Sequence, residues 1–503
     1  MNREAGILLP ISALPSKYGI GCFSKEAYDF VDFLERSGQS VWQILPLCPT
    51  GYMDSPYQSI CSFAGNPYFI CPERLVGDGL LTDEECENYS ADKGNGRIDY
   101  GLLYEKRYPL LRKAFERFRS RPRSEEYSQF LTENSFWLFD YALFCAIKAH
   151  FGNISLQNWE SAAKHREGAR LSALRNELSE DIDFHIFTQF QFFIQWHELK
   201  AYANKKGIKI MGDIPIYVSA DSSDLWVSPH LFLLDSELSP LSVAGCPPDA
   251  FSPSGQLWGN PLYDWRSHKK EGYAWWLSRL SHAFSMYDIV RIDHFRGFES
   301  YYSVPAGDSD AVGGHWERGV GSEIFRAFES SFGSQDIVAE DLGYVTSGVR
   351  QLLRECGFAG MKIIQFGFDG DDWDFTSEYL PHYYGKNSIV YTGTHDNPTL
   401  VQWLSSLSES SERKLRCYLC DYITPLTSLR YKVISLAMES VSRLCIIPMQ
   451  DYLGIGAEGR MNLPASASGN WSWRMSISDT NDDIASNIKL ITEVSGRSRK
   501  AEN

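Results

Sequence analysis

The sequence predicts a (β/α)8 TIM barrel, a fold of the α/β class, with large inserted subdomains after the second and third strands. Eight short, apolar, β-branched runs recur along the 503 residues. Stretches with helical character separate these runs, and strands that alternate with helices form a parallel sheet. A barrel typically takes ~250 residues, so the remaining length must lie in insertions. With 43% hydrophobic residues the chain can bury a large core, and we expect residues 1–503 to form one barrel domain.

The eight runs are expected to become the barrel strands in chain order. The helical stretch Gln189–Lys206 leads directly into the third run, as the winding of a strand–helix–strand unit requires. In order, the runs are Gly6–Ile11, Val41–Leu47, Ile208–Val218, Asp288–Ile292, Asp336–Ala339, Met361–Phe368, Ser388–Tyr391 and Leu444–Met449.

Two long gaps between these runs place the insertions. Residues 50–205 contain amphipathic helical sequence at Tyr104–Phe118 and Ser135–Phe151, with the charged segment Ser120–Glu126 between them. We expect this region to form a mostly helical subdomain. Residues 219–285 are rich in Pro, Gly and aromatic side chains, which favours ordered loops over a flexible linker. We expect this loop-rich subdomain to cover the active-site cleft.

The composition excludes several classes of partner. A net charge of -16 argues against nucleic acid and against anionic membranes. No apolar run reaches the ~18 residues of a membrane-spanning helix, and the apolar N-terminal stretch is broken by Pro10. Eleven scattered cysteines predict reduced thiols and a cytoplasmic location. The single CxxC at Cys417 and Cys420 has no second pair to complete a zinc site, so we predict no metal and no cofactor.

Acidic residues follow several of the predicted strands, at the end of a barrel where active sites lie. Asp213 lies in the third run, and Asp293 ends the fourth. Glu340 follows the fifth run, and Asp396 follows the seventh. A single acid at such a place most often caps a helix or starts a turn. Several acids on successive strand ends instead indicate that the side chains converge on one pocket.

Two of these acids suit a retaining glycosidase-type site, in which a carboxylate pair stands about 5–5.5 Å apart. Arg291 lies two residues before Asp293, on the same face of the strand, and would keep this carboxylate ionised as a nucleophile requires. Glu340 has a longer reach and follows an apolar run that would raise its pKa, as a proton donor requires. Asp396 could stabilise developing positive charge and His395 could donate to a sugar hydroxyl.

Several segments resemble the 4-α-glucanotransferases of the α-amylase clan, known as amylomaltases or disproportionating enzymes. The segments RIDHFRG at 291–297, AEDLG at 339–343 and THDN at 394–397 resemble the signature regions of the clan. Longer, irregular segments narrow the resemblance to the glucanotransferases, and the match runs from Ile7 to about Trp473. They are DSPYQ at 54–58, AGNPY at 64–68, GDIPIYV at 212–218, GQLWGNPLYDW at 255–265, PMQDYLG at 448–454 and RMN with GNWSWR at 460–474.

The resemblance implies a barrel without a separate C-terminal β-domain, and it implies an activity. Segments of α-1,4-glucan would pass between maltodextrins, which serve as donor and acceptor, with retention and a covalent intermediate. Carried over motif by motif, Asp293 is the nucleophile, Glu340 the acid/base and Asp396 the transition-state stabiliser. Met53 departs from the family pattern, because a glycine is expected before DSPYQ.

The resemblance also implies residues that bind the substrate or support the acids. Tyr57 would stack near the donor sugar. The loop Pro248–Pro261 would overhang the acceptor, and it contains Asp249 and Trp258. The full set is Tyr57, Asp213, Asp249, Trp258, Arg291, His294, His395 and Asn462. Asp341, beside the catalytic glutamate, is expected to point elsewhere, toward a helix cap or a salt bridge.

Other functions remain open from the sequence. An amylase-like hydrolase would use the same acids, and the aromatic segment Pro247–Trp265 could decide the outcome by excluding water, although loop aromatics often serve only packing. A non-catalytic glucan-binding protein would not need three acids. The pattern GxGxxG at Gly454–Gly459 suggests a nicotinamide enzyme only if a helix opens there, and Pro464 opposes this. The sequence does not give the oligomeric state.

Overall fold

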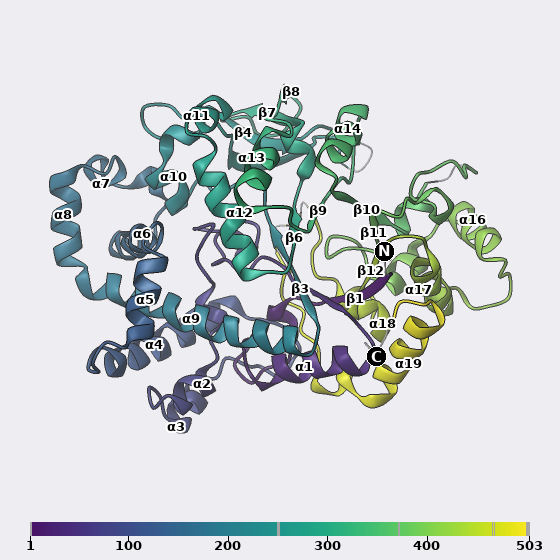
Figure 1. The fold of residues 1–503 in the computed structure, drawn as a ribbon, viewed down its shortest axis with the longest axis horizontal. Coiled ribbons are helices and arrows are strands. Elements are labelled where there is room, and N and C mark those ends of the chain that lie inside the picture. The colour runs from purple at the N-terminus through teal and green to yellow at the C-terminus, as the bar shows by residue number, and fades with distance from the viewer. Residues whose placement is uncertain (1–2, 249–251, 371–372, 465, 467, 499–503) are drawn as a thin grey trace.

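Eight parallel strands close into a barrel in the order β1-β12-β11-β10-β9-β6-β3-β2, as Figure 1 shows. The computed structural model describes residues 3–248, 252–370, 373–464, 466 and 468–498. Each predicted run contains or overlaps one barrel strand, so the predicted TIM barrel is confirmed. The strands are β1 (Glu4–Leu8), β2 (Val41–Gln43), β3 (Lys209–Ile214), β6 (Ile289–Ile292), β9 (Ile337–Ala339), β10 (Ala359–Ile363), β11 (Ser388–Tyr391) and β12 (Leu444–Pro448).

The strands are short and buried, which explains why they read as continuous apolar runs. All four residues of β11 and all five of β12 are buried. Several predicted runs extend past the end of the strand, because the residues that follow are also apolar but turn into loops. The run Met361–Phe368 is an example: β10 ends at Ile363, and a 3₁₀ turn occupies Gln365–Gly367.

Helices from outside the two insertions flank the barrel. They include α1 (Lys25–Arg36), α13 (Glu323–Phe332), α14 (Ser347–Cys356), α15 (Leu400–Ser406), α16 (Glu409–Leu419), α17 (Arg430–Glu439), α18 (Met449–Leu453) and α19 (Asp482–Val494). The last helix packs on α1 and α17. Arg497, just after it, donates from Nη1 to the carbonyl of Glu4 at 2.8 Å. The two ends of the described chain therefore meet, and no strand follows β12 in the part that is described.

Residues 50–205 are mainly helical and lie to the left of the barrel in Figure 1. The helices are α2 (Pro72–Gly77), α3 (Asp83–Asn88), α4 (Tyr100–Arg119), α5 (Glu125–Glu133), α6 (Leu138–His150), α7 (Ser161–Lys164), α8 (Gly168–Glu177) and α9 (Ser179–Lys205). Helix α5 was not expected from the charged segment. The Ser124 side chain caps it by accepting from the amide of Tyr127, and Tyr127 and Phe130 bury its inner face.

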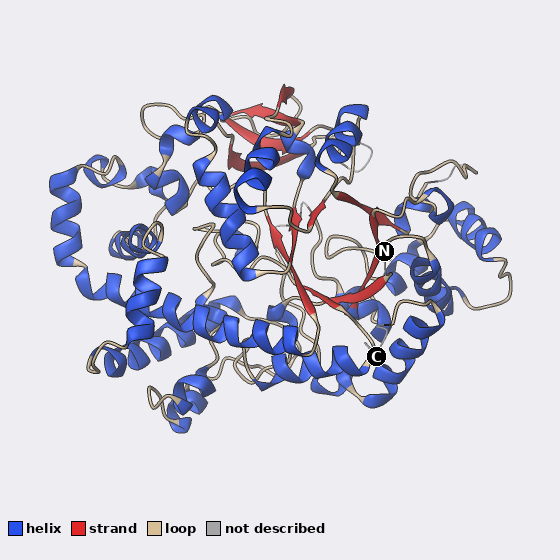
Figure 2. Cartoon of the chain, in the orientation of Figure 1, coloured by secondary structure: helices blue, strands red, loops and turns tan. Residues whose placement is uncertain are grey.

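A second, antiparallel sheet stands beside the barrel and was not predicted. Its four strands run in the order β5-β4-β7-β8, and Figure 2 shows them in red at the top of the view. The strands are β4 (Ser242–Cys246), β5 (Gln256–Pro261), β7 (Ser300–Pro305) and β8 (His315–Arg318). Residues 219–285 supply the first two, together with α10 (Ser223–Val227), α11 (Trp265–Lys270) and α12 (Ala274–Met286). A further insertion after β6 supplies the other two.

Two general features bear on the expectations from composition. None of the helices in the described ranges is both long enough and apolar enough to cross a membrane. No disulfide links any of the eleven cysteines, all of which lie within the described residues.

Candidate functional site

One buried arginine contacts three carboxylates at the C-terminal ends of adjacent barrel strands. Arg291 Nη1 lies 2.5 Å from Asp213 Oδ2 and 3.1 Å from Asp293 Oδ1, and its Nη2 lies 3.7 Å from Glu340 Oε2. The strand register produces this grouping, because Asp213 pairs with Arg291 between β3 and β6, and Ile292 pairs with the residue before Glu340 between β6 and β9. The contact between Arg291 and Asp293 expected from their spacing is present.

The Glu340 side chain is fixed by the turn that follows β6. His294 has a left-handed backbone with φ of 48°, and its amide N–H donates to Glu340 Oε2 at 2.5 Å. The backbone of Glu340 is also tied to this segment, because its N–H donates to the Ile292 carbonyl at 3.0 Å. The glutamate therefore keeps one oxygen on a backbone donor, which leaves Oε1 for a substrate.

Burial raises the pKa of both Asp293 and Glu340, and Arg291 opposes the effect at each carboxyl. Their carboxylates also repel each other, so the two groups titrate as a pair. The guanidinium is closer to Asp293, and the Asp293 side chain is 27% exposed against 16% for Glu340. Both differences favour the charge on Asp293 and the remaining proton on Glu340, whereas the His294 N–H acts in the opposite sense, because it lowers the pKa of Glu340.

A second group of side chains is built around Tyr57 and the loop after β11. Tyr57 Oη donates to Asp213 Oδ2 at 2.7 Å and lies 3.0 Å from His395 Nε2. The phenol has one proton, so His395 must donate from Nε2. Burial lowers the pKa of His395, which agrees with a neutral ring. Asn462 Nδ2 donates to Asp396 Oδ1 at 2.6 Å, and His395 Nε2 lies 3.4 Å from Asp396 Oδ2.

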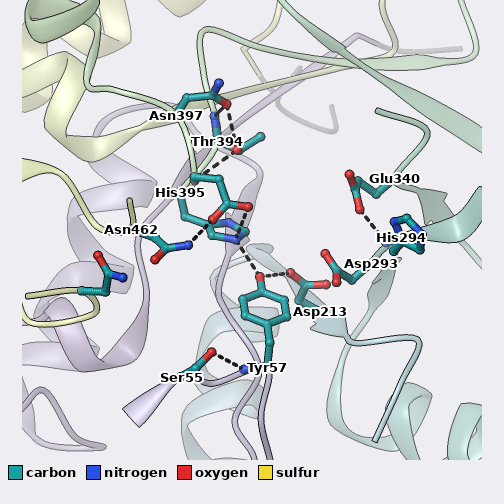
Figure 3. A network of polar contacts seen from close by, with 12 residues as sticks. Ser55, Tyr57, Asp213, Asp293, His294, Glu340, Thr394, His395, Asn397 and Asn462 are labelled. Carbon is teal, nitrogen blue, oxygen red and sulfur yellow. Dashed lines mark hydrogen bonds and ion pairs between the residues drawn. The ribbon is translucent and has the colours of Figure 1, made fainter. Parts of the chain in front are cut away.

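Figure 3 shows the two groups in one view. Asp293, His294 and Glu340 lie on one side of Tyr57, while His395 and Asn462 lie on the other. The phenol hydroxyl is the polar link between the sides, through its contacts with Asp213 and His395.

A cleft of about 950 Å³ opens beside these groups. It is lined by Trp258, by Asn462 and Trp471, and by Lys93–Gly101 from the helical region. The Trp258 ring stands edge-on to His294 at 4.7 Å, and the Trp471 ring lies 5.8 Å from His395. The cleft is thus flanked by aromatic rings at both sides of the site. The four acids are not among the residues that line this cleft, which adjoins them through Trp258 and Asn462. Another groove, of about 810 Å³ between α5, α9 and α12, also lacks the four acids and is lined by none of the predicted site residues.

The structure brings together Asp213, Asp293, Glu340 and Asp396, as expected, with Tyr57, Trp258, Arg291, His294, His395 and Asn462. Asp249 lies outside the described residues, with its neighbours 250–251. Met53 has a positive φ of 58°, a conformation that suits the expected glycine better than a side chain.

Three further residues support the site and were not identified from the sequence. Arg460 Nη2 donates to the Asp396 carbonyl at 2.9 Å, and Trp471 packs against Tyr57 with ring centroids 5.8 Å apart. Asp451 is buried and accepts from Thr392 Oγ1 at 2.5 Å and from the Leu400 amide at 2.7 Å. It therefore holds both ends of the loop that carries His395 and Asp396. All three lie in segments that resemble the 4-α-glucanotransferases, PMQDYLG and RMN with GNWSWR. That resemblance is the signal in the sequence that could have identified them.

Two sequence motifs do not form sites of their own. Gly454 has φ of 71° and ends the short helix α18, and the pattern then holds the 3₁₀ turn Ala457–Gly459 in place of the α-helix that a dinucleotide site requires. Cys417 Sγ accepts from Tyr422 Oη at 3.3 Å at the end of α16. The described residues contain no group of three His, Cys, Asp or Glu side chains that could hold a metal ion.

Comparison with known proteins supplies an independent result. A family described as 4-alpha-glucanotransferase matches residues 9–479. The chain is 45% identical to a 4-alpha-glucanotransferase of Clostridium butyricum over 488 residues, 97% of this chain and 99% of the relative. It is 41% identical to one of Thermus thermophilus over 507 residues, 99% of each chain. Amylomaltase from Streptococcus agalactiae, solved in complex with acarbose, is 42% identical with a TM-score of 0.96, over 99% of this chain and 100% of that one.

Proposed function

Because the chain belongs to the 4-α-glucanotransferase family, we propose that it moves α-1,4-glucan segments between maltodextrins through a covalent glycosyl-aspartate intermediate, with retention of configuration. The observation that carries this mechanism is the contact of Arg291 with three carboxylates of unequal burial. A retaining enzyme needs one ionised and one protonated carboxyl on either side of the scissile bond. The unequal contacts of Asp293 and Glu340 favour that division.

In the first step, the ionised Asp293 attacks the anomeric carbon of the donor and forms an ester bond to it. The bond from that carbon to the glycosidic oxygen breaks, and Glu340 gives its proton to the departing oxygen. Since Glu340 Oε2 accepts from the His294 amide, the proton is carried by Oε1. The shortened glucan leaves with a free 4-hydroxyl group.

In the second step, a 4-hydroxyl of the acceptor attacks the same carbon. Glu340, now ionised, takes the hydroxyl proton while the ester bond to Asp293 breaks. The new glycosidic bond has the configuration of the old one, because the carbon has been inverted twice. The balance of the reaction is one glycosidic bond broken and one formed.

Asp396 is proposed to bind sugar hydroxyls and to stabilise the positive charge that develops at the reacting carbon. Its side chain is 45% exposed, and Asn462 and His395 hold its oxygens from one side. The neutral His395 ring has one N–H, on Nε2, which would exchange Tyr57 Oη for a sugar hydroxyl when substrate binds. Tyr57 stacks on His395 with centroids 5.3 Å apart and 16° between planes, and it presents an aromatic face for a donor sugar.

The choice between transfer and hydrolysis depends on what reaches the ester bond on Asp293. Trp258 and Trp471 flank the cleft and offer apolar faces to an acceptor sugar. An ordered acceptor would displace water from the intermediate, which favours transfer. We propose the segment of β5 around Trp258 as the part of the cleft that binds the acceptor, and Asp249, outside the described residues, stays a predicted acceptor residue.

The deciding experiment is incubation of the purified protein with maltotriose alone, followed by chromatography of the products. Transfer predicts glucose together with a ladder of longer maltodextrins, at little net gain of reducing ends. A hydrolase would release glucose and maltose with a rising number of reducing ends. Unchanged maltotriose would contradict both and indicate a glucan-binding protein. The complex of the similar Streptococcus agalactiae amylomaltase with acarbose supports α-glucans as ligands, and a cytoplasmic location remains a prediction from the cysteines.

A further inference from the structure

The ladder between β9 and β10 is the shortest in the barrel, although β9 leads directly into Glu340. The two strands share two register pairs, the last of which joins Ala339 to Gly360, whereas the other barrel ladders have three to five pairs. Toward β6, the Glu340 backbone is tied by its N–H to Ile292 and by its carbonyl to the amide of Phe295 at 3.1 Å. Toward β10, the register pairs end before Glu340.

The side chain of Asp341 connects the two strands just beyond this point. Its Oδ1 accepts from the backbone N–H of Met361 on β10 at 2.6 Å, and the residue is 8% exposed. A Cβ atom on Gly360 would lie 2.6 Å from Asp341 Oδ2. The carboxylate therefore rests directly on this glycine. The contact is a tie between strands, and differs from the helix cap or salt bridge expected from the sequence.

We propose that Asp341 is a positioning residue that fixes the direction of Glu340 by tying the end of β9 to β10. The inference rests on the proposed function, because it takes Glu340 to be the acid/base. Adjacent residues share a peptide plane, so a fixed Asp341 side chain restricts the backbone from which the Glu340 side chain departs. Glu340 is then held between the ties to β6 on one side and the tie to β10 on the other.

The role of Asp341 is geometric more than electrostatic. Burial raises the pKa of Asp341 to about 7, while the Met361 N–H and the cation of Lys362 oppose the shift. The charged or titratable groups that face it are Glu340, Lys362 and Tyr379. In either protonation state, an oxygen remains that can accept from Met361. An asparagine keeps such an oxygen and should replace the aspartate.

The first test compares Asp341→Asn with Asp341→Ala, with Glu340→Gln assayed in parallel. We expect D341N to keep kcat within about threefold of the original protein, because the Met361 tie is retained. D341A should lower kcat on the order of 100-fold, the scale for a displacement of about 1 Å in an active site, with KM changed less than about threefold. An inactive E340Q with an unimpaired D341A would overturn this inference alone. An unimpaired E340Q would instead overturn the proposed role of Glu340.

The second test reaches the same contact from the opposite strand. Gly360→Ala places a methyl group against the carboxylate, so it should lower kcat on the scale of D341A. In the double variant G360A/D341A, the methyl group meets no carboxylate. Its kcat should therefore be less than about threefold below that of D341A alone. Independent effects of the two substitutions would overturn the proposed contact. Leu352→Ala, in the buried face of α14, provides a destabilised control that should keep kcat.

A pH profile separates positioning from simple loss of folded protein. Burial raises the pKa of Glu340, so a Glu340 released from its place should have a lower pKa. The basic limb of kcat/KM in D341A should then move to lower pH. Unfolding would scale the whole profile without moving the limb. An unmoved limb, or a loss of activity equal to the unfolded fraction, would overturn the inference.

Discussion

The two sides of the site are built from different kinds of interaction. On the side of β3, β6 and β9, buried charges are packed around Arg291, whose side chain is 3% exposed. On the side of β11 and the segment after β12, the neutral groups His395 and Asn462 hold Asp396, which is 45% exposed. Buried charges interact strongly and shift each other's pKa. Exposed groups with neutral partners can instead exchange hydrogen bonds with a sugar at little cost.

We call the side around Arg291 the charged side, and the side on which neutral groups hold Asp396 the neutral side. The difference suggests a division of labour between them. Bond making and proton transfer need groups whose charge is set before the substrate arrives, and the charged side provides these through Asp293 and Glu340. Sugar recognition needs groups that can give up one partner for another, and the neutral side provides these. Tyr57 joins the two, since its hydroxyl contacts Asp213 on one side and His395 on the other.

The largest expected effect comes from removing the proposed nucleophile on the charged side. Asp293→Asn should lower the rate of transfer from maltotriose on the order of 10⁴-fold, because no ester intermediate can form. Asn462→Ala on the neutral side is the matched comparison and should cost about 10- to 100-fold, the value of one hydrogen bond to a charged group. Product ladders measured over time give both rates. Similar losses in the two variants would contradict the division of labour.

Removal of a single oxygen atom should break the hydrogen-bonded link between the two sides. Tyr57→Phe removes the hydroxyl that donates to Asp213 and accepts from His395. A hydrogen bond to a charged group contributes about 1.5–3 kcal/mol, so kcat should fall about 10- to 100-fold. The ring that stacks on His395 remains, so KM for the donor should change little. A raised KM with an unchanged kcat would show that Tyr57 belongs to the neutral side alone.

The pH dependence should come from the charged side. Burial raises the pKa of Glu340 above the ordinary glutamate value of ~4.3. The proton donor must be protonated, so activity should persist above that value and fall about tenfold per pH unit once the raised pKa is passed. Asn462→Ala should leave the limb in place. A basic limb near the ordinary glutamate value would contradict a buried proton donor.

The same shift has a consequence for stability. A carboxyl with a raised pKa in the folded state contributes stability that is complete below the unfolded pKa, and this contribution is lost as pH rises through the folded pKa. Glu340→Gln removes the ionisation. The variant should therefore lose less stability than the original protein between acid and neutral pH. Thermal unfolding across this pH range measures the difference.

The sequence was sufficient for the barrel and for the charged side of the site. A buried strand such as Ser388–Tyr391 is apolar throughout and can be recognised locally. The acids at the strand ends follow from barrel geometry. The separate sheet could not be predicted, because β5 is partly exposed and ends in Asn260-Pro261, and because β4 pairs with β7 although β5 and β6 lie between them in the chain.

The residues that support Asp396 on the neutral side were also difficult to predict from the sequence. Its support comes from contacts between loops that are distant along the chain. Asp451 binds Thr392 from 59 residues away, and Arg460 binds the Asp396 carbonyl from 64 residues away. No periodicity or strand end marks such residues. Only resemblance identified the segments that contain them.

The smallest effect expected is on the fate of the intermediate. Trp258→Ala should raise hydrolysis relative to transfer about two- to tenfold, the range for loss of one aromatic stacking contact. Leu257→Ala is the matched control, since it removes an exposed apolar side chain from the same strand and the same cleft. Reducing ends count hydrolysis, and longer maltodextrins count transfer. Trp258 also packs on His294, and its Nε1–H donates to Gln256 Oε1 at 3.1 Å. An unchanged ratio of hydrolysis to transfer in W258A would therefore assign Trp258 to packing and leave acceptor binding to other residues of the cleft.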